Sequence, residues 1–583
     1  MEKNKMWLRL ARLYMVAAAI GPCPWAGAQS TAPIAVVGVQ TGIDTNAGQR
    51  PARQNINDLY ARGGPQWDLY VLALSSLQTT NETDELSYFQ ISGIHGLPFT
   101  SWNGVGQVAG GSMSGYCPHN ELIFATWHRP YVALFEQILV SHAVSWANQY
   151  PDSSAPAYQA AAQLLRQPYW DWAADGRLPV AATSPNVTVN GPKGAMSLRN
   201  PLYNYQFQQP AVEASMGGPL AAYAETIRCP LPGDPSINNA TASDVHMAVV
   251  QQQLRDYAYD AFTRTNTFDI MAYDASGGAS FENPHNLVHN SAGCGGTLGD
   301  INWSAFDPLF MLHHCNTDRL IAMWQAIHYD NFMFTTSGVS NGQWGTAAKT
   351  VTTADSPLKP FFQADLATLH TSNSVAAIKT FGYTYPEIND WSTTPEELAT
   401  YVRAQVNTLY GPDDLNGGAN SGSKSRIRGA RYDNPPSQQQ FSKYYTAEVS
   451  VNRSELPLPV TVNLVVSGDE GGVVLGRMAI LGMPSTGMTY ASIPIQRAML
   501  RMTGNLSSVV KNLVPDKVIP FLQQNLMLEI RKNDGTTVPL DTVPSLQLEV
   551  QDLDYVPPAN NNSSAFPGFG KATTWPVKGG GRC

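Results

Sequence analysis

The 583-residue chain has few charged side chains and no excess of positive charge. Asp, Glu, Lys and Arg account for 14% of its residues, and 45 acidic against 36 basic residues give a formal net charge of −9. Nucleic acids and anionic membranes are bound through basic surfaces, so neither is expected as a partner. With 43% hydrophobic and 10% aromatic residues, the chain is expected to be soluble and globular, with two or more domains and a small neutral partner.

Cysteine is also scarce, with six residues in the whole chain. So few cysteines exclude the dense disulfide framework of small secreted domains. Cys23 falls in an N-terminal segment that we expect to be removed, which leaves an odd number. The sequence alone does not determine how Cys229, Cys294 and Cys583 pair, although Cys229 and Cys294 are candidates for one disulfide.

The N-terminus lacks the uninterrupted run of roughly 20 apolar residues that a membrane-spanning helix needs. Basic residues precede a short apolar stretch from Leu13, which Gly21 and Pro22 interrupt and which ends at the small residues Ala26-Gly27-Ala28. This order is typical of a secretory signal, so we interpret residues 1–28 as a signal peptide rather than a membrane anchor, and we expect secretion. Asn-X-Ser/Thr sequons are consistent with that route. They begin at Asn81, Asn186, Asn239, Asn302, Asn452, Asn505, Asn561 and Asn562.

Apolar residues recur at helical spacing in several segments of the first 410 residues. These segments are 55–78, 121–146, 155–165, 245–262, 307–327 and 394–409. Long loops rich in Gly, Pro and Asn separate them, and no internal repeat is evident. The sequence therefore predicts a mainly helical first part.

The character of the sequence changes after residue 410. Residues 411–440 lack apolar periodicity and are dense in Gly, Ser, Asn and Pro, which is typical of an exposed loop or linker. From residue 441, apolar and polar residues alternate in β-branched runs, and Asn533-Asp534-Gly535 is a hairpin signal. We therefore predict a helical domain over residues 29–440 and a β-rich, sandwich-like domain over residues 441–583.

Seven of the eleven histidines fall into two clusters. The first cluster contains His95, His119 and His128, and the second contains His285, His289, His313 and His314. His285 and His289 are four residues apart, so on a helix both imidazoles lie on one side and can share a metal ion. Consecutive helical residues are rotated by about 100°, so only one of His313 and His314 is expected to reach that ion.

A single HxxxH pair is more often an ordinary core or surface pair than a metal site, but a second histidine-bearing helix favours the metal. Two sites of three histidines each, without clustered cysteines or carboxylates, suit the metals that prefer imidazole. Copper, zinc, iron and nickel all meet this description. The residues alone do not decide among them.

Four stretches, HNELIFATWHRPYVALFEQIL, PYWDWA, ENPHNLVHN and FDPLFMLHHCNTDRL, resemble the copper-A and copper-B motifs of the tyrosinase family, with the best fit to its fungal members. The resemblance runs from about Arg53 to Val451. It implies a binuclear type-3 copper centre, which binds dioxygen between two copper ions, in a four-helix core. Carried over motif by motif, it assigns His95, His119 and His128 to the first copper and His285, His289 and His314 to the second.

The resemblance also assigns roles to neighbours of these ligands. Cys117 matches a cysteine that fungal members bond covalently to a copper-ligating imidazole, here His119; the alternative is a free buried thiol. Cys315 is expected to be a small apolar filler. His313 is expected to pack beside the site. Asp307, Asp318 and Arg319 are expected to fix the helix and to orient the ligands by hydrogen bonds.

Hydroxylation of a monophenol needs a base, because a phenol with a pKa of about 10 is almost wholly protonated at neutral pH. In the resembling tyrosinases a Glu and an Asn hold a water that takes the proton, and Glu282 and Asn286 stand in their places. The alternative is that Glu282 only caps the helix of His285. Ile301 aligns with the hydrophobic gate over the first copper, and Phe310 is expected to pack against the ligands.

The β-rich domain resembles the fungal extension that covers the copper site in a latent proenzyme. Tyr444-Tyr445 stands in the place of the family's tyrosine motif, for which Arg53 is the expected partner. The family is usually cut after that motif, but the loop over residues 411–440 also offers basic cleavage sites, so the activation site stays open. These sites are Lys424, Arg426, Arg428 and Arg431.

The expected activity is the oxidation of phenols to o-quinones by dioxygen, with two copper ions as cofactor. The nearest alternative is a catechol oxidase or o-aminophenol oxidase that lacks the hydroxylating step. An oxygen carrier of the haemocyanin type and a mononuclear zinc hydrolase are more remote alternatives. The physiological phenol, the lid residue that blocks the site and the oligomeric state stay open.

Overall fold

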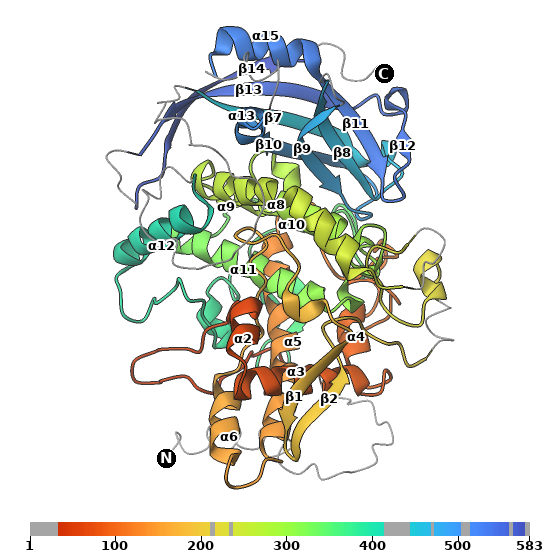
Figure 1. The fold of residues 1–583 in the computed structure, drawn as a ribbon, viewed down its shortest axis with the longest axis vertical. Helices are drawn as coiled ribbons and strands as arrows, with labels where there is room; N and C mark the ends of the chain where they lie inside the picture. Colours follow the sequence, from red (N-terminus) through yellow and green to blue (C-terminus); the bar gives the residue numbers. More distant parts are fainter. Residues whose placement is uncertain are drawn as a thin grey trace.

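The computed structural model describes residues 33–209, 216–231, 237–412, 443–467, 472–502, 513–558 and 564–577. The predicted signal peptide, Cys583, the candidate cleavage residues and the predicted domain boundary at residue 440 lie outside these ranges. Within them, a helical part runs to residue 412 and a β-rich part begins at residue 443 (Figure 1). The predicted class of fold, a helical core followed by a β-rich domain, is confirmed.

The helical part is built from ten described α-helices, several of which coincide with the predicted segments. They are α2 (Ile56–Arg62), α3 (Pro65–Thr79), α4 (Tyr88–Gly93), α5 (Phe124–Ala147), α6 (Ala155–Leu164), α8 (Ala240–Thr263), α9 (Phe268–Ala272), α10 (Glu282–Gly293), α11 (Leu309–Ile327) and α12 (Pro395–Tyr410). The helix predicted over residues 55–78 is divided in two. Gly63 and Gly64 interrupt it with φ angles of 62° and 76°, a conformation that glycine adopts without steric cost.

Helix α5 lies at the centre of the helical part, where it packs against α3, α6 and α11. Most of its residues are buried, because it is hydrophobic on nearly all sides and is enclosed by its neighbours. Helix α10 packs against α8 on one side and contacts α11 on another. Helices α5, α10 and α11 carry most of the clustered histidines, so this packing brings the two clusters together. Three short antiparallel hairpins complete this part: β1 (Asn186–Gly191) with β2 (Gly194–Arg199), β3 (Gly338–Val339) with β4 (Val351–Thr352), and β5 (Pro357–Phe362) with β6 (Leu369–Thr371).

The β-rich part contains two antiparallel four-stranded sheets, in the orders β10-β7-β13-β14 and β12-β11-β8-β9. Their strands are β7 (Lys443–Asn452), β8 (Val460–Val466), β9 (Val473–Ile480), β10 (Met488–Pro494), β11 (Leu526–Lys532), β12 (Thr537–Val538), β13 (Gln547–Val556) and β14 (Gly568–Pro576). Helices α13 (Gln496–Leu500) and α15 (Pro515–Asn525) accompany them. Alternating apolar residues of β7 and β8 are buried, which is the pattern that the alternation in the sequence predicts.

The β-rich part rests on α8 and α10 (Figure 1). Arg497 of α13 forms an ion pair with Asp256 of α8 at 2.5 Å. The Tyr444 hydroxyl of β7 donates to the Asp260 carboxylate of α8 at 2.7 Å. These directed contacts hold the β-rich part against the face of the core where α10 carries His285 and His289.

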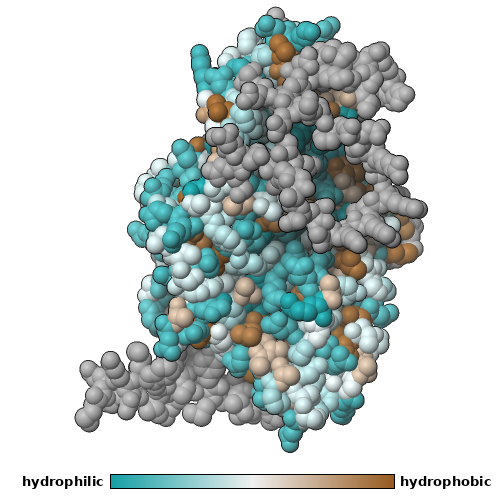
Figure 2. Space-filling view, turned by 60° about the vertical axis from the view of Figure 1, so that its left-hand side comes forward, coloured by the Kyte–Doolittle hydropathy of each residue, from teal (hydrophilic) through white to brown (hydrophobic). Residues whose placement is uncertain are grey.

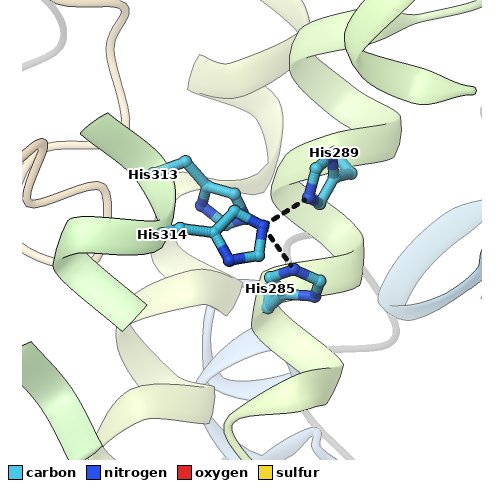
Figure 3. A group of neighbouring side chains, drawn as sticks. All are labelled: His285, His289, His313 and His314. Atoms are coloured by element: carbon cyan, nitrogen blue, oxygen red, sulfur yellow. Dashed lines mark hydrogen bonds between the residues drawn. The ribbon is translucent and has the colours of Figure 1, made fainter. Parts of the chain in front are cut away.

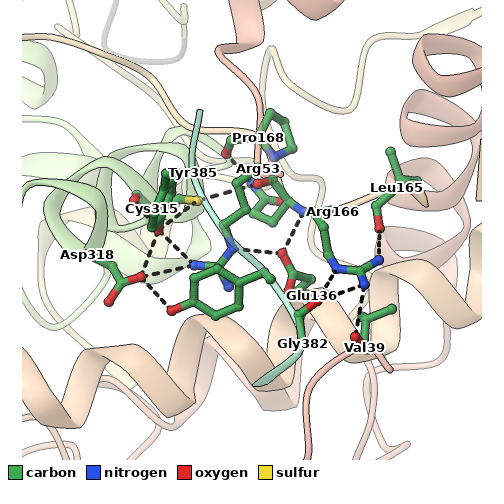
Figure 4. Close-up of polar contacts among 12 residues, drawn as sticks. Val39, Arg53, Glu136, Leu165, Arg166, Pro168, Cys315, Asp318, Gly382 and Tyr385 are labelled. Atoms are coloured by element: carbon green, nitrogen blue, oxygen red, sulfur yellow. Dashed lines mark hydrogen bonds and ion pairs between the residues drawn. The ribbon is translucent and has the colours of Figure 1, made fainter. Parts of the chain in front are cut away.

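Arg53 contacts Tyr383 and Tyr385 of the helical part and not Tyr444-Tyr445, its predicted partners. Its Cζ lies 3.5 Å from the centre of the Tyr383 ring, and its Nη1 donates to the Tyr385 hydroxyl at 3.0 Å (Figure 4). Tyr444 instead contacts Asp260. The prediction that pairs Arg53 with Tyr444-Tyr445 is therefore wrong, because the earlier sequence Tyr383-Thr384-Tyr385 supplies both rings.

Figure 2 shows one face of the molecule, coloured by hydropathy. In the face shown in Figure 2, hydrophilic residues predominate and hydrophobic residues form small separate patches. Among the helices of the described ranges, none is both long enough and apolar enough to cross a membrane.

Candidate metal centre

The second cluster is formed where α10 faces α11. His285 and His289 project from one side of α10, as their spacing predicts, and His313 and His314 project toward them from α11 (Figure 3). His314 Nε2 lies 3.2 Å from His285 Nε2 and 3.3 Å from His289 Nε2. All four side chains are fully buried, and one ring nitrogen from each lies within 4.8 Å of the others.

His313 lies closer to the second cluster than the 100° rotation between neighbours suggests. Its ring centre is 4.8 Å from that of His285 and 4.6 Å from that of His289. His313 also contacts Trp172, at 5.9 Å between ring centres, whereas His314 stacks on His128 of the first cluster at 4.4 Å. The two rings therefore differ in their other neighbours. His314 contacts His128 and so joins the two clusters, whereas His313 contacts Trp172.

The first cluster is built from two loops and a helix. His95 follows α4, His119 lies in the loop that precedes α5, and His128 is in the second turn of α5. Their ring centres are 5.2 to 5.7 Å apart. His119 lies five residues before α5, which begins at Phe124. Its ring stacks on His285 at 5.8 Å, so the two clusters form one continuous group of imidazoles.

The ring nitrogens of these histidines are arranged as metal ligands require. The Nδ1–H groups of His128 and His289 donate to the backbone carbonyls of Phe124 and Leu298, both at 2.8 Å. A carbonyl oxygen only accepts, so Nδ1 carries the proton and Nε2 carries the lone pair. Two such lone pairs, from His285 and His289, point at His314 Nε2. Lone pairs that converge in a buried place repel one another unless a proton or a metal ion lies between them, so the arrangement fits a metal ion.

Buried nitrogens without partners also point to a metal. Within the described ranges, neither ring nitrogen of His95 or His119 has a hydrogen-bond partner, and neither does His128 Nε2. Buried polar atoms are almost always paired, so these atoms fit ligands of an ion. Burial lowers the pKa of all seven clustered imidazoles, to about 3 for His128 and about 4 for His289. All are therefore neutral at physiological pH, the state that binds metals.

The four cysteines within the described ranges divide into a disulfide and two buried thiols. Cys229 and Cys294 form a disulfide, with 4.7 Å between their Cα atoms, which ties the loop before α8 to the end of α10. The Cys117 Sγ donates to the His95 carbonyl at 3.0 Å and lies within 4.8 Å of ring nitrogens of His95 and His119. A bond from Cys117 to His119 stays a prediction. Cys315 is buried against backbone of the core, consistent with a filler.

The charged residues predicted to fix the helix and to orient the ligands do anchor helix α11. Asp307, just before α11, accepts from Arg228 at 2.6 Å, and Asp318 accepts from Arg129 at 2.6 Å. Arg319 pairs with Asp171 and with Glu387. Within the described part of the chain, the hydrogen bonds of these three residues do not go to imidazoles. The three residues therefore act on the ligands only by fixing the helix that carries them. Periodicity in the sequence gave no signal for their ion-pair partners.

Glu282 is the first residue of α10 and is 1% exposed. Its Oε1 accepts from the Asn120 N–H at 2.6 Å, and its Oε2 accepts from the Asp274 N–H at 2.9 Å. The carboxylate therefore joins the loop of His119 to α10, and its recorded bonds do not cap its own helix. Burial, and then the nearby Asp274 carboxylate, raise the pKa of Glu282 well above its ordinary value.

Asn286 and Asp274 continue this buried network. Asn286 Oδ1 accepts from the Nδ1–H of His285 at 2.9 Å, and its Nδ2 donates to Asp274 Oδ2 at 2.9 Å. Burial raises the pKa of Asp274 to about 7. Asp274 is a member of the site that sequence reasoning missed, because it belongs to no motif and lies eleven residues before His285 in the chain.

Phe310 of α11 stacks on His314 with ring centres 4.1 Å apart.

Residues of the β-rich part close the site. Ile301 lines a small cavity beside His95 and His119, and Met483 and Pro484, from the loop between β9 and β10, line it as well. The cavity measures about 20 Å³, which is room for about one water molecule and too little for a phenol ring.

Comparisons with known proteins agree with this geometry. The common central domain of tyrosinase matches residues 85–327, and the tyrosinase C-terminal domain matches residues 444–550. A tyrosinase of Podospora anserina is 36% identical over 399 residues, which cover 64% of this chain and 68% of that protein. Polyphenol oxidase 2 of Agaricus bisporus is 32% identical, with 67% of this chain and 69% of that protein covered.

Two solved structures share the fold over nearly the whole chain. A structure of latent and active mushroom tyrosinase (abPPO4) superposes with a TM-score of 0.76 at 24% identity, covering 93% of this chain and 98% of that one. An Aspergillus oryzae pro-tyrosinase superposes with a TM-score of 0.70 at 21% identity and the same coverage. The buried histidine clusters fit copper, and the matched domains span both parts of the molecule. The chain therefore belongs to the tyrosinase family of copper-dependent, phenol-oxidising oxidoreductases.

Proposed function

We propose that the chain is a tyrosinase in the narrow sense, which binds two copper ions and oxidises both monophenols and o-diphenols to o-quinones with dioxygen. The observation that carries this proposal is the pair of buried histidine clusters in contact through His128 and His314. His95, His119 and His128 would hold one ion, and His285, His289 and His314 the other. The bound copper pair would supply the redox chemistry that activates dioxygen.

Glu282 and Asn286 carry the proton chemistry in this proposal. The hydroxyl proton of a monophenol must leave before hydroxylation, and a carboxylate that holds a water can take it. An ionised carboxylate has about four lone-pair sites, of which the N–H groups of Asn120 and Asp274 occupy two, so sites remain for the water. Burial, and then Asp274, raise the pKa of Glu282, and a higher pKa makes its carboxylate a stronger base once it is ionised.

The atoms of the net reaction balance without another reductant. One oxygen atom of dioxygen enters the ring of the monophenol. The other oxygen leaves as water with the two hydrogen atoms that the phenol loses. For an o-diphenol no oxygen enters the ring, and both oxygen atoms leave as water with hydrogens from two substrate molecules.

The β-rich domain would keep the enzyme latent. Met483 and Pro484 line, together with His95, His119 and Ile301, a cavity of about 20 Å³, which is too small for a phenol. A core over residues 29–440 and a lid over residues 441–583 would separate on cleavage between them. The Aspergillus oryzae structures are of a pro-tyrosinase with the same fold, which supports a proenzyme. The N-terminal segment and the sequons support secretion.

Metal content and substrate range test the function. The full chain should contain two copper ions by elemental analysis, with a near-ultraviolet absorption band that appears on exposure to oxygen. After limited proteolysis it should oxidise both tyramine and catechol. One zinc ion instead of two copper ions would overturn the proposal, and activity toward catechol without activity toward any monophenol would favour the catechol oxidase alternative.

A further inference from the structure

Asp274 touches both residues to which the proposed proton chemistry is assigned. Its backbone N–H donates to Glu282 Oε2 at 2.9 Å, and its Oδ2 accepts from Asn286 Nδ2 at 2.9 Å. Its other carboxylate oxygen, Oδ1, accepts from the Ser280 hydroxyl at 2.6 Å. The side chain is 2% exposed, so solvent does not compete for these bonds.

The bond to Asp274 determines which way the Asn286 amide faces. An amide has one accepting end and one donating end, and both carboxylate oxygens of Asp274 act as acceptors. The donating end of Asn286 must therefore turn to Asp274, which leaves Oδ1 facing the Nδ1 of His285 at 2.9 Å. In the reverse orientation the amide N–H groups would face Nδ1.

The orientation of Asn286 in turn selects the tautomer of His285. With Oδ1 as its neighbour, Nδ1 must carry the proton, and the lone pair is then on Nε2, 3.2 Å from His314 Nε2. A reversed amide would favour the tautomer with the proton on Nε2. That tautomer presents no lone pair to the place where the Nε2 atoms of His285, His289 and His314 meet.

We propose that Asp274 is a positioning residue of the second copper site, which acts through Asn286 to keep His285 in the tautomer that can bind a metal. This inference rests on the proposed function only in taking copper to be bound by this cluster. No segment outside the described residues takes part in it. Asp274 does not touch the metal ligands themselves, so its effect is on the affinity and geometry of the site.

The test measures copper affinity in the full-length apoprotein by competition with a chromophoric Cu(I) chelator. The variants are Asp274→Asn, the reciprocal exchange Asp274→Asn with Asn286→Asp, and Asp269→Asn as a control on the preceding helix α9. Asp274→Asn should weaken the second copper by about tenfold or more, as loss of a supporting partner of a metal ligand does. Asp269→Asn should leave the affinity unchanged.

The reciprocal exchange should restore copper binding to within about threefold of the wild type. In that variant the new carboxylate at position 286 accepts from His285 Nδ1–H, and the new amide at position 274 donates to it, so the same tautomer is selected. Thermal unfolding of each apoprotein shows whether it folds. If Asp274→Asn does not fold, the copper affinity of the reciprocal variant tests the inference.

Two results would overturn the inference: unchanged affinity in a folded Asp274→Asn protein, or a folded reciprocal variant that still binds the second copper about tenfold or more weakly than the wild type. The proposed function has a separate readout. Wild type that binds two copper ions but does not hydroxylate tyramine refutes monophenol turnover and leaves the role of Asp274 standing.

Discussion

Replacement of Glu282 by Gln is the most direct test of the proposed proton chemistry. Gln has nearly the same shape but cannot accept a proton at neutral pH. One of the two backbone N–H groups that Glu282 accepts, from Asn120 or Asp274, would then face the amide N–H₂ group. A buried donor left without a partner costs about 1–3 kcal/mol, so the variant should fold with a lower melting temperature.

The kinetic effect of Glu282→Gln should fall mainly on monophenols. At pH 7 a phenol with a pKa of about 10 is ionised in only about one molecule in a thousand. A positioned general base typically contributes about 10²–10⁴-fold, so kcat/KM for tyramine should fall by about 100-fold or more. Catechol turnover inserts no oxygen into the ring and should change by less than about tenfold, because it depends less on this base.

The pH dependence of turnover provides an independent test of the role of Glu282. Burial and Asp274 raise the pKa of Glu282, so the carboxylate becomes ionised only as the pH rises through that raised value. The ratio of tyramine to catechol turnover in the wild type should therefore increase with pH. Glu282→Gln should lose this increase, because its amide does not titrate.

Glu121→Gln is a matched control for this comparison. Glu121 is also a buried carboxylate next to the loop of His119, but it accepts from the Asn341 N–H at 2.5 Å and from Gln343, not from the residues around α10. All proteins would be treated with protease and assayed for copper content as well as for kcat/KM on both substrates. An unchanged tyramine-to-catechol ratio in copper-loaded Glu282→Gln would refute the assignment of Glu282 as the base.

Three further predictions concern the ligands, the lid and the anchoring of α11. His314→Ala should lose the second copper, whereas His313→Ala should keep it with kinetics altered by about 10–100-fold; equal copper loss in both variants by elemental analysis would contradict this difference. Met483→Gly in the intact chain should raise catechol oxidation without protease, because Met483 lines the small cavity beside His95 and His119. Wild type that is fully active before proteolysis would exclude a lid. Asp318→Asn should destabilise the apoprotein by about 3–5 kcal/mol, since it leaves a buried guanidinium without its carboxylate. Burial opposes ionisation of Asp318, but Arg129 and Arg53 lower its pKa below the ordinary value, so this stabilisation is present above pH about 4 and is lost as the pH falls through the lowered pKa. Urea unfolding should show the wild type and Asp318→Asn converging in acid.

The histidines could be predicted from the sequence because their signal is local. The spacing of His285 and His289 places both on one side of α10 whatever the helix packs against. Apolar periodicity likewise predicts the amphipathic α12, and alternation predicts the strands of the β-rich part, since both patterns reflect burial of one face. Combined with the motif resemblance, these signals were enough to name the candidate ligands and the order of the two parts.

Only the tertiary structure determined the contacts between distant segments. Arg53 meets Tyr383 and Tyr385 more than 300 residues later, whereas the sequence motif pointed to Tyr444-Tyr445 as its partner. Met483 lines the same cavity as His119 because the loop between β9 and β10 reaches it, and no pattern in the sequence marks that loop. The position of Asp274 depends on how the loop after α9 folds back on α10. Such contacts follow from the packing of whole elements, which local spacing and composition do not encode.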